Sequence, residues 1–429
     1  MNIRAKAYWL IDRLKGGKVR SYCNEINRCL KDGISDDDLQ LKKILEWAVN
    51  NTRFYAKYRS FKSLRDFPII DKSIIRDNTN DMIALGFDKN QMFKQITSGS
   101  TGTPLVTYQD PQKRLRARAD TIVFSNIAGY HLGTKLYYSR VWNEANYKSK
   151  IQCITENIVM QDSSNLGEDA LNEFIKQLEE DKSEKSVLVF ASSLSALYYH
   201  MKKYNITTSA RVNCFITMSE SLPDEVKHGI EKIFDTNVIS RYSNVECGIM
   251  AQQLPGSNDY IINTSSFHIE LLKLDCDEPA DNGEIGRIVV TDLYNKGMPI
   301  IRYNTGDCGV ISCVSVDGKD KLYFTRIDGR IVDCVYSTSG DLLSPVIVIN
   351  TMWKYTDIKQ FQFIQNGKKD YLLKLNLDGE KEYGRIDNLL KDLKEYTGYD
   401  AIIDVEYVNE IPLLASGKRK QVINNYKPV

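Results

Sequence analysis

The sequence predicts an α/β protein: a large N-terminal domain with mostly parallel sheets and a β-rich subdomain, plus a small α+β C-terminal domain that acts as a mobile lid. Two observations support this fold class. Apolar strand candidates alternate with helical stretches through the first half of the chain, and the pattern then becomes β-rich before a separate mixed pattern begins. The predicted boundaries are 1–65 for a helical N-terminal segment, 66–260 for the α/β core, 261–328 for the β-rich subdomain and 329–429 for the lid.

The N-terminal segment is expected to be helical. Leu41, Ile44 and Ala48 recur at helical spacing among charged residues, which is typical of an amphipathic helix. Pro68 then breaks this pattern, and Asp71 is a suitable cap for a helix that begins at the next residue. The segment therefore leads into the core through a turn and a further helix.

The core is expected to hold a largely parallel sheet, because strand and helix candidates alternate. The strand candidates are residues 136–141, 186–190, 211–218 and 237–241, and the helix candidates are residues 169–180, 193–204 and 223–234.

The β-rich subdomain is expected to form an appended barrel or sheet, because Gly and Asp turns separate its strand candidates. These candidates are residues 267–274, 286–291, 308–314 and 322–325. The lid candidates are strands at residues 358–365, 371–377 and 401–408 and a helix at 383–396.

Composition favours a small ligand over a polymeric partner. The 429 residues are 42% hydrophobic, and 57 basic against 56 acidic residues leave a formal net charge of +1. This balance gives no electrostatic argument for nucleic acid or an anionic membrane as partner. No apolar run approaches the roughly 18 to 20 residues of a membrane span, and the N-terminus does not resemble a signal peptide, so we expect a cytoplasmic protein.

The nine cysteines are dispersed, which favours reduced thiols over a disulfide framework. Cys276, Cys308 and Cys313 could meet His268 at a zinc ion, but their spacing is not that of a structural zinc module. We therefore assign no zinc site.

The strongest local signal is a run of small and hydroxylated residues that follows an apolar one. It reads Ile96-Thr97-Ser98-Gly99-Ser100-Thr101-Gly102-Thr103-Pro104. Glycine lets a backbone approach phosphate closely, while hydroxyl and N–H groups donate hydrogen bonds to it. The run lacks the Gly-Lys-Ser/Thr ending of a Walker A loop. Taken alone, it fits either a phosphate-binding loop or a solvated turn.

Two later segments carry side chains suited to a nucleotide. Tyr242 and Glu246 follow a strand candidate, so that one could stack on adenine while the other holds Mg²⁺. Asp307 stands in a Gly-Asp turn at a strand end, where a carboxylate can accept two hydrogen bonds from a ribose diol. Each segment alone also fits an ordinary structural turn.

Six motifs resemble, in order and at similar intervals, the core motifs of the adenylate-forming superfamily, which includes acyl-CoA synthetases, peptide-synthetase adenylation domains and luciferase. They occupy residues 97–104, 219–221, 242–246, 302–307, 329–330 and 416–418. Chain length and the helical N-terminal segment look closest to phenylacetate-CoA ligase and to its relatives from capsular polysaccharide biosynthesis clusters. The resemblance covers about residues 67–424. It implies an ATP-dependent adenylate-forming ligase.

The resemblance implies catalytic roles for Thr97, Glu246 and Lys418. Glu246 would ligate Mg²⁺, and Lys418, on the mobile lid, would bridge the acid's carboxylate and the α-phosphate. The β- and γ-phosphates would be wrapped by Ser98, Gly99, Ser100, Thr101, Gly102 and Thr103. The nucleotide pocket would be lined by Ser219, Glu220 and Ser221, and adenine would stack on Tyr242, with Ser243 beside it. Asp307 would hold the ribose hydroxyls, and Arg330 would contact the ribose and phosphate region.

The implied reaction uses ATP and Mg²⁺ to join a carboxylic acid to AMP, with release of pyrophosphate. The acyl group would then pass to CoA or to an amine or hydroxyl acceptor, for example on a sugar nucleotide or glycan precursor in surface polysaccharide biosynthesis. Pairing of two copies through the N-terminal helices is a further expectation. The sequence does not predict the identity of the acid. An acyl pocket could be lined by Trp142, Tyr137, Tyr138 and His131, although aromatic residues near a strand are more often core.

Two departures from the family pattern bear on the acyl transfer. The position two residues after the hinge arginine, Arg330, usually carries an acidic or polar residue, but here it is Val332, followed by Asp333. Residues 336–341, Tyr-Ser-Thr-Ser-Gly-Asp, replace the usual glycine-rich loop. These departures weaken the inference that CoA is the acceptor.

Two other interpretations compete with a ligase. A catalytically idle nucleotide-binding protein of the same fold is disfavoured by the intact loop together with Glu246, Asp307 and Lys418. A P-loop kinase is disfavoured by the missing Lys-Ser/Thr pair, and it would yield ADP where adenylation yields AMP. The product nucleotide therefore separates the three.

The substitution Lys418→Ala tests the role implied for this lysine. A carboxylate that attacks an α-phosphate brings anion toward anion, so loss of one donor is expected to cost about 3 to 4 kcal/mol, roughly 10²- to 10³-fold in rate. We expect acid-dependent pyrophosphate release to be nearly abolished while ATP binding stays measurable. Unchanged release would refute the assigned role.

Overall fold

The computed structural model divides the chain into two compact units. It describes residues 2–33, 39–97, 105–140, 142, 147–163, 166–219, 221–316, 318–330, 335–343, 345–355, 357–377, 382–412 and 420–426. The large unit comprises Met1–Thr305 and Gly309–Arg326, and the small unit comprises Gly306–Cys308 and Ile327–Val429. The finer domain boundaries expected from the sequence, and the mobility of the C-terminal domain, stay predictions.

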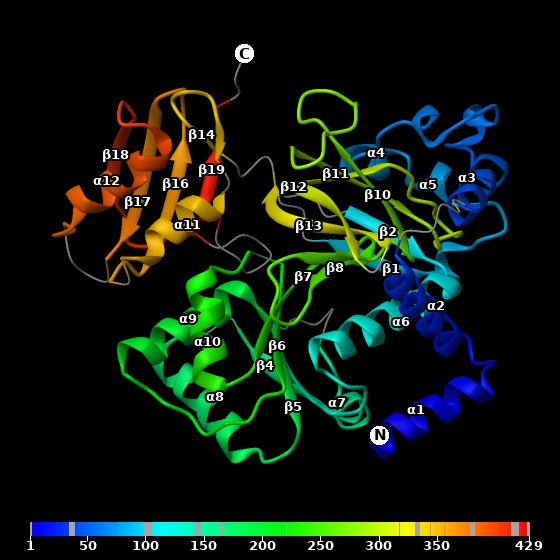
Figure 1. Cartoon of the computed structure of the whole chain (residues 1–429), viewed down its shortest axis with the longest axis horizontal. Helices are drawn as coiled ribbons and strands as arrows, with labels where there is room; N and C mark the ends of the chain where they lie inside the picture. The colour runs from blue at the N-terminus through cyan, green and yellow to red at the C-terminus, as the bar shows by residue number, and fades with distance from the viewer. Residues whose placement is uncertain are drawn as a thin grey trace. The chain divides into compact units, whose positions relative to one another are not determined.

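An eleven-stranded sheet is the largest element of the fold, with the order β10-β11-β12-β13-β9-β8-β7-β6-β5-β3-β4 (Figure 1). Strands β3 to β7 pair in parallel, and antiparallel pairing begins between β7 and β8. The bounds are β3 Lys135–Arg140, β4 Ile158–Asp162, β5 Lys185–Phe190, β6 Cys214–Met218, β7 Asn237–Asn244, β8 Gly248–Gln253, β9 Tyr260–Ile262, β10 Phe267–Leu272, β11 Ile285–Asp292, β12 Tyr303–Val316 and β13 Lys319–Arg330.

The β-rich strands do not form the separate barrel or sheet expected from the sequence. They extend the parallel sheet, because β8 turns back beside β7 and carries the hydrogen-bonded ladder onward. The predicted fold class is confirmed: a mixed α/β large unit is accompanied by a small α/β unit.

Helices α8 to α10 cover one face of the parallel strands (Figure 1). Leu171, Leu194 and Val226, one from each helix, share a buried cluster with Val187 of β5. The predicted helical N-terminal segment and the three predicted core helices are confirmed. The helices are α1 Ile3–Leu14, α2 Lys18–Asp32, α3 Leu39–Asn51, α4 Lys72–Asp77, α5 Thr79–Met82, α6 Pro111–Ala128, α7 Lys150–Glu156, α8 Glu168–Glu180, α9 Ala191–Lys203 and α10 Asp224–Phe234, with 3₁₀ turns Ala56–Tyr58, Leu64–Asp66 and Lys89–Gln91.

Helix α6 was not predicted, because its buried face carries charges as well as apolar groups. Lys113 forms an ion pair with Asp292 at 2.6 Å, and both side chains are 0% exposed. The Arg116 guanidinium is also fully buried and donates to the Ser266 hydroxyl at 2.8 Å. The helix packs between α2 and strands β8 and β9. A search for a purely apolar helical stripe therefore passes over it.

Asp110 clamps the start of α6 to a distant turn. Its Oδ1 accepts hydrogen bonds from the backbone N–H groups of Gln112 at 2.7 Å and Lys113 at 3.0 Å. Its Oδ2 accepts from the N–H groups of Lys296 at 2.8 Å and Gly297 at 2.9 Å. Because a Cβ at Gly297 would lie 3.0 Å from the Asp110 Cβ, glycine permits this close approach.

The small unit contains a four-stranded sheet of order β18-β17-β16-β19 with two helices. Leu389 and Leu393 of α12 and Val348 of α11 pack on this sheet in one buried cluster. The predicted strand–strand–helix–strand succession is confirmed. The bounds are β14 Val335–Tyr336, β15 Leu342–Leu343, α11 Pro345–Trp353, β16 Gln360–Gln365, β17 Asp370–Asn376, α12 Ile386–Thr397, β18 Ile402–Tyr407 and β19 Val422–Asn424.

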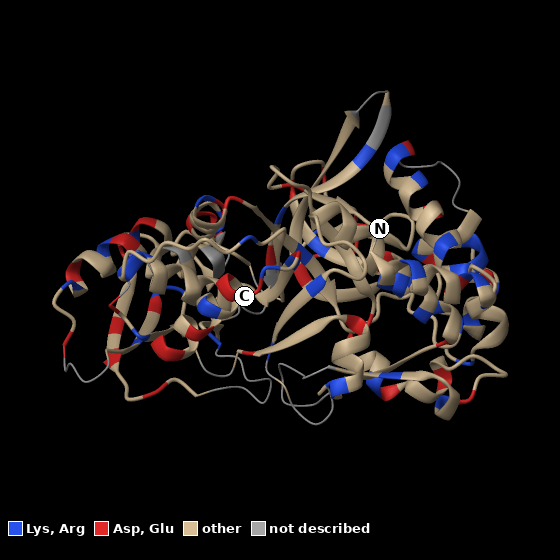
Figure 2. Cartoon of the chain, turned by 90° about the horizontal axis from the view of Figure 1, so that it is seen from below, with Lys and Arg blue, Asp and Glu red and all other residues tan. Residues whose placement is uncertain are grey.

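Acidic and basic residues both occur in each of the two units (Figure 2). Within the part of the chain that the structure describes, no helix combines the length and apolarity needed to cross a membrane.

Candidate functional site

The predicted phosphate loop joins the two strands of a hairpin. Strand β1, Phe93–Thr97, pairs antiparallel with β2, Leu105–Gln109, and Thr97 stands opposite Leu105. The side chain of Thr97 and the loop residues Ser98, Gly99, Ser100, Thr101, Gly102, Thr103 and Pro104 lie outside the described residues. The hairpin brings the two ends of the loop together, and the Asp110 clamp directly follows β2.

Several predicted nucleotide-binding residues lie at the carboxyl end of the parallel strands, where open α/β sheets bind ligands. Ser219 follows β6 with a positive φ of 70° and is exposed. Tyr242 and Ser243 lie near the end of β7, where the pairing with β8 is interrupted by a register shift. The Tyr242 hydroxyl donates to the Thr305 hydroxyl at 3.3 Å, and the Tyr242 ring meets Phe324 edge-on at 5.9 Å. Ser221 is half-buried, and Glu220 lies outside the described residues.

Glu246 is a buried carboxylate in the turn after β7, only 2% exposed. The Tyr303 hydroxyl donates to its Oε1 at 2.8 Å, and the Lys72 ammonium lies 3.4 Å from the same oxygen. The backbone carbonyl of Glu246 accepts from the Gln109 side chain at 3.4 Å, which links this turn to β2. The predicted nucleotide strands and the phosphate-loop hairpin therefore meet at Glu246.

Glu246 fits a magnesium ion that shares its coordination with a nucleotide. Only its Oε1 is hydrogen-bonded or ion-paired by other described residues, so Oε2 is available as a ligand. Mg²⁺ in phosphoryl-transfer sites is commonly held by one or two carboxylates, substrate phosphates and water. Among the described residues there is no cluster of three or more His, Cys, Asp or Glu that could enclose a metal. Phosphates and water would have to complete the shell.

Arg302 holds the segment before α4 against the sheet. Its Nε and Nη2 donate to the two carboxylate oxygens of Glu270, each at 3.0 Å, and its Nη1 donates to the Phe67 carbonyl at 3.0 Å. Ile70 N donates to the Arg302 carbonyl at 3.0 Å, and Asn304 N donates to the Ile70 carbonyl at 2.8 Å. The segment therefore lies beside the start of β12.

Lys72 was missed by sequence reasoning as a site residue. Asp71 was predicted as a helix cap, and its Oδ1 does accept from Ile74 N at 2.9 Å. The cap fixes the first turn of α4, from which Lys72 reaches Glu246. The only local signal was this cap, and the contact with Glu246 could not be read from either segment alone.

The remaining predicted site residues are only partly described. The Gly-Asp turn predicted at a strand end is wrong: Asp307 is half-buried inside the continuous strand β12, Tyr303–Val316. Arg330 is the last residue of β13, and its side chain lies outside the described residues. Lys418, Val332 and Asp333 also lie outside them. The roles assigned to these residues stay predictions.

Of the four aromatic candidates for an acyl pocket, Tyr138 and Trp142 lie together. Tyr137 is a core residue, 4% exposed, whose hydroxyl donates to Asp181 Oδ2 at 3.0 Å; burial and this carboxylate raise its pKa. His131 is exposed. At the carboxyl end of β3, the rings of Tyr138 and Trp142 lie 5.3 Å apart, and the Arg140 guanidinium lies 5.6 and 5.5 Å from their centres.

The fold is that of adenylate-forming ligases. A 2-hydroxyisobutyryl-CoA ligase, solved in the postadenylation state in complex with R3-HIB-AMP, aligns with a TM-score of 0.69 at 15% identity, covering 90% of this chain and 88% of the ligase chain. The amide bond synthetase McbA from Marinactinospora thermotolerans aligns with a TM-score of 0.53 at 12% identity, covering 79% of this chain and 70% of McbA.

Sequence comparisons add a family model and a curated relative. Residues 335–425 match the family model of the CapK C-terminal domain. Protein CapK of Staphylococcus aureus is 23% identical over 437 residues, covering 96% of this chain and 94% of CapK. The predicted resemblance to adenylate-forming ligases and to capsule-associated relatives is confirmed. The closer assignment to phenylacetate-CoA ligase stays a prediction.

The substitution Arg302→Lys tests whether this side chain secures the segment before α4. Lysine keeps the positive charge, but it cannot bond both oxygens of Glu270 and the Phe67 carbonyl in one planar arrangement. We expect the free energy of unfolding of the large unit, measured by urea titration, to fall by about 2 kcal/mol.

Arg287→Lys is the matched control. Arg287 also donates to two backbone carbonyls and one carboxylate, but its partner Asp277 has a side chain that is 69% exposed. The loss in this control should stay below about 1 kcal/mol. Equal losses in the two variants would contradict the special position of Arg302.

Proposed function

We propose that this chain activates a carboxylic acid with ATP, forming an acyl-adenylate and releasing pyrophosphate. The observation that carries the proposal is the convergence at Glu246, where a buried carboxylate is held by Tyr303 and Lys72. Tyr242 lies on the strand just before it, and the phosphate-loop hairpin lies just beside it. A fold shared with ligases solved with an acyl-adenylate supports the same reaction.

Each side chain in the proposed site has a role that suits nucleotide binding. Tyr242 would stack on adenine, and the loop after Thr97 would donate to the phosphates. Glu246 would hold Mg²⁺, which when bound neutralises phosphate charge. Tyr303 and Lys72 would keep Glu246 Oε1 occupied, so that Oε2 is the oxygen presented to the metal. Asp307, Arg330 and Lys418 would act as the family resemblance implies.

The electrostatic demand of the reaction explains this choice of side chains. The acid's carboxylate and the α-phosphate are both anionic, so their approach requires donors and cations in fixed positions. Because Lys72 is already paired with Glu246, the two together are nearly neutral in the absence of ligand. Binding of the strongly anionic phosphates would allow a second cation to join this carboxylate without a large net charge.

The acyl acceptor is proposed to be CoA or an amine or hydroxyl group. A solved complex of 2-hydroxyisobutyryl-CoA ligase contains CoA with the adenylate, and McbA is an amide bond synthetase, so the fold serves both kinds of acceptor. The similarity to CapK supports an acceptor from surface polysaccharide biosynthesis. The unusual residues 336–341 favour an acceptor other than CoA.

Product analysis tests the proposed half-reaction. The full chain is incubated with ATP, Mg²⁺ and a panel of aryl, amino and hydroxy acids, with and without CoA, while nucleotides, pyrophosphate and acyl products are measured by chromatography and mass spectrometry. We expect the pyrophosphate released to equal the sum of acyl-adenylate and free AMP, dependent on one class of acid, with free AMP rising when an acyl acceptor is present. Formation of ADP would indicate a kinase, and absence of turnover with every acid would indicate an idle nucleotide-binding protein.

The substitution Glu246→Gln tests the metal role. Glutamine keeps the shape and can still accept the Tyr303 hydrogen bond, but it loses the charge that binds Mg²⁺. Because loss of even an outer-shell partner commonly costs 10- to 100-fold in metal affinity, we expect the Mg²⁺ concentration for half-maximal pyrophosphate release to rise at least about tenfold. Glu173→Gln, at an exposed position of α8, should leave it unchanged. An unaltered Mg²⁺ requirement in Glu246→Gln would remove Glu246 from the metal site.

A further inference from the structure

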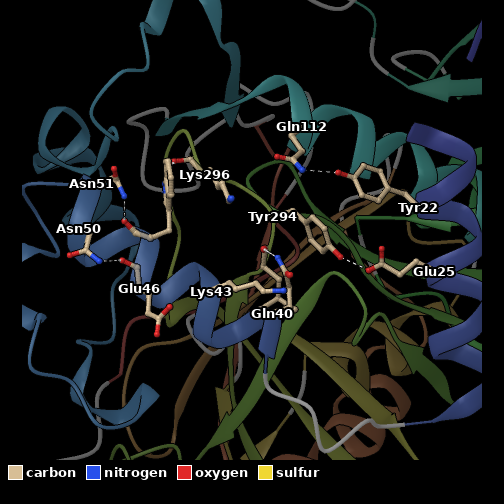
Figure 3. A pocket seen from close by; sticks show the side chains of 12 residues that line it. Tyr22, Glu25, Gln40, Lys43, Glu46, Asn50, Asn51, Gln112, Tyr294 and Lys296 are labelled. Atoms are coloured by element: carbon tan, nitrogen blue, oxygen red, sulfur yellow. Dashed lines mark hydrogen bonds between the residues drawn. The ribbon is translucent and has the colours of Figure 1, made fainter. Parts of the chain in front are cut away.

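A cavity of about 510 Å³ lies in the large unit and shares no lining residue with the proposed ATP site. Its walls come from α2, α3, the first turn of α6 and the segment after β11, and we call it the α2–α3 pocket (Figure 3). Its volume is in the range of small-molecule binding sites. The chemistry of its walls decides which class of molecule fits.

The side-chain amides of the pocket present acceptors. The NH₂ groups of Gln40, Asn50 and Asn51 donate to backbone carbonyls at 3.0, 2.9 and 2.9 Å (Figure 3). Because a carbonyl can only accept, these bonds fix which end of each amide is nitrogen, and the amide oxygens remain as acceptors. A ligand with hydroxyl or N–H donors would complement these oxygens.

The two carboxylates of the pocket differ in how far they are compensated. Glu25 lies 3.0 Å from the Nη1 of the fully buried Arg116 and also accepts a hydrogen bond from the Tyr294 hydroxyl. Glu46 is paired with Lys42 of the same helix at 3.9 Å. Glu25 therefore does not have to be neutralised by a ligand, whereas Glu46 is exposed to solvent and its pairing with Lys42 is weak.

Two lysines of the pocket are not compensated. Lys43 of α3 and Lys296 line the cavity, and neither forms an ion pair with a carboxylate of the described residues. The Lys296 ammonium lies 4.9 Å from the centre of the Trp47 ring, which keeps it at the pocket wall. Residues 1–65 contain fifteen Lys and Arg against seven Asp and Glu, so the surrounding helices add to the positive potential.

We propose that the α2–α3 pocket binds an anionic sugar, a polyhydroxylated small molecule with a carboxylate or phosphate group. Lys43 and Lys296 would receive the anion, and the amide oxygens would accept from the hydroxyls. A plain dicarboxylate would leave the amide acceptors unmet, and a neutral sugar would leave the lysines unpaired. This second site goes beyond acid activation and does not depend on it.

Direct binding to the full chain tests the pocket without any turnover. Glucuronate, glucose 6-phosphate, glucose and inorganic phosphate are titrated by calorimetry at low ionic strength. We expect glucuronate or glucose 6-phosphate to bind at least about tenfold more tightly than glucose or phosphate, and added salt to weaken that binding. The two charged sugars distinguish a carboxylate from a phosphate as the anionic group.

Matched lysine substitutions locate the binding. Lys43→Met and Lys296→Met should each weaken the charged sugar about tenfold or more, because each removes a charge-assisted hydrogen bond. Lys31→Met makes the same change at an exposed position of α2 that does not line the pocket, and it should leave affinity unchanged. If Lys296→Met disturbs folding through Trp47, the exposed Lys43 still carries the test.

Four results would overturn the proposal. These are no binding of either charged sugar, equal affinity for glucose, equal affinity for inorganic phosphate, and equal losses in Lys43→Met and Lys31→Met. None of these results requires catalysis, so a failure here leaves the acid-activation proposal to its own test.

Discussion

The bidentate pair between Arg302 and Glu270 is the constraint on which the candidate site depends. Arg302 is buried and Glu270 is half-buried, and removing such charges from water is costly unless the remaining hydrogen-bonding groups are also satisfied. The backbone carbonyl of Phe67 completes the arginine's bonds, and this ties an N-terminal segment to the sheet. Arg302 itself has a positive φ of 52°, an unusual conformation for a non-glycine residue that these contacts hold in place. Lys72 reaches Glu246 only because this segment is fixed.

A second fixed point, Asp110, serves the other side of the site. One carboxylate accepts four backbone N–H groups, from the start of α6 and from the turn at Lys296 and Gly297. The end of β2 is therefore fixed in position, whereas the segment that precedes β2 in the chain consists of small residues. The α2–α3 pocket depends on the same contacts, because Gln112 and Lys296, whose backbone N–H groups donate to Asp110, both line it. Buried polar contacts therefore position residues of both the candidate site and the α2–α3 pocket.

Local periodicity predicted much of the fold, and its failures have physical causes. Helices α8 to α10 and strands β5 to β7 were predicted because their apolar residues alternate at regular spacing. Helix α6 was missed because Lys113 and Arg116 stand on its buried side, each paired with a group from a distant segment. In the candidate site, Tyr242 and Glu246 were recognisable as motif residues. The contacts of Lys72 and Tyr303 with Glu246 join segments far apart in the chain, and no local pattern encodes such contacts.

The strand order separates two groups of side chains in the proposed enzyme. Tyr138 and Trp142 lie at the end of β3, whereas Tyr242 lies on β7, three strands away and roughly 14 Å across the sheet. Mutations near β3 can therefore accumulate without disturbing the groups around Glu246. With the acyl-pocket role expected for Tyr138 and Trp142, a lineage with this architecture could change the acid it accepts in small steps while the proposed nucleotide site is inherited intact.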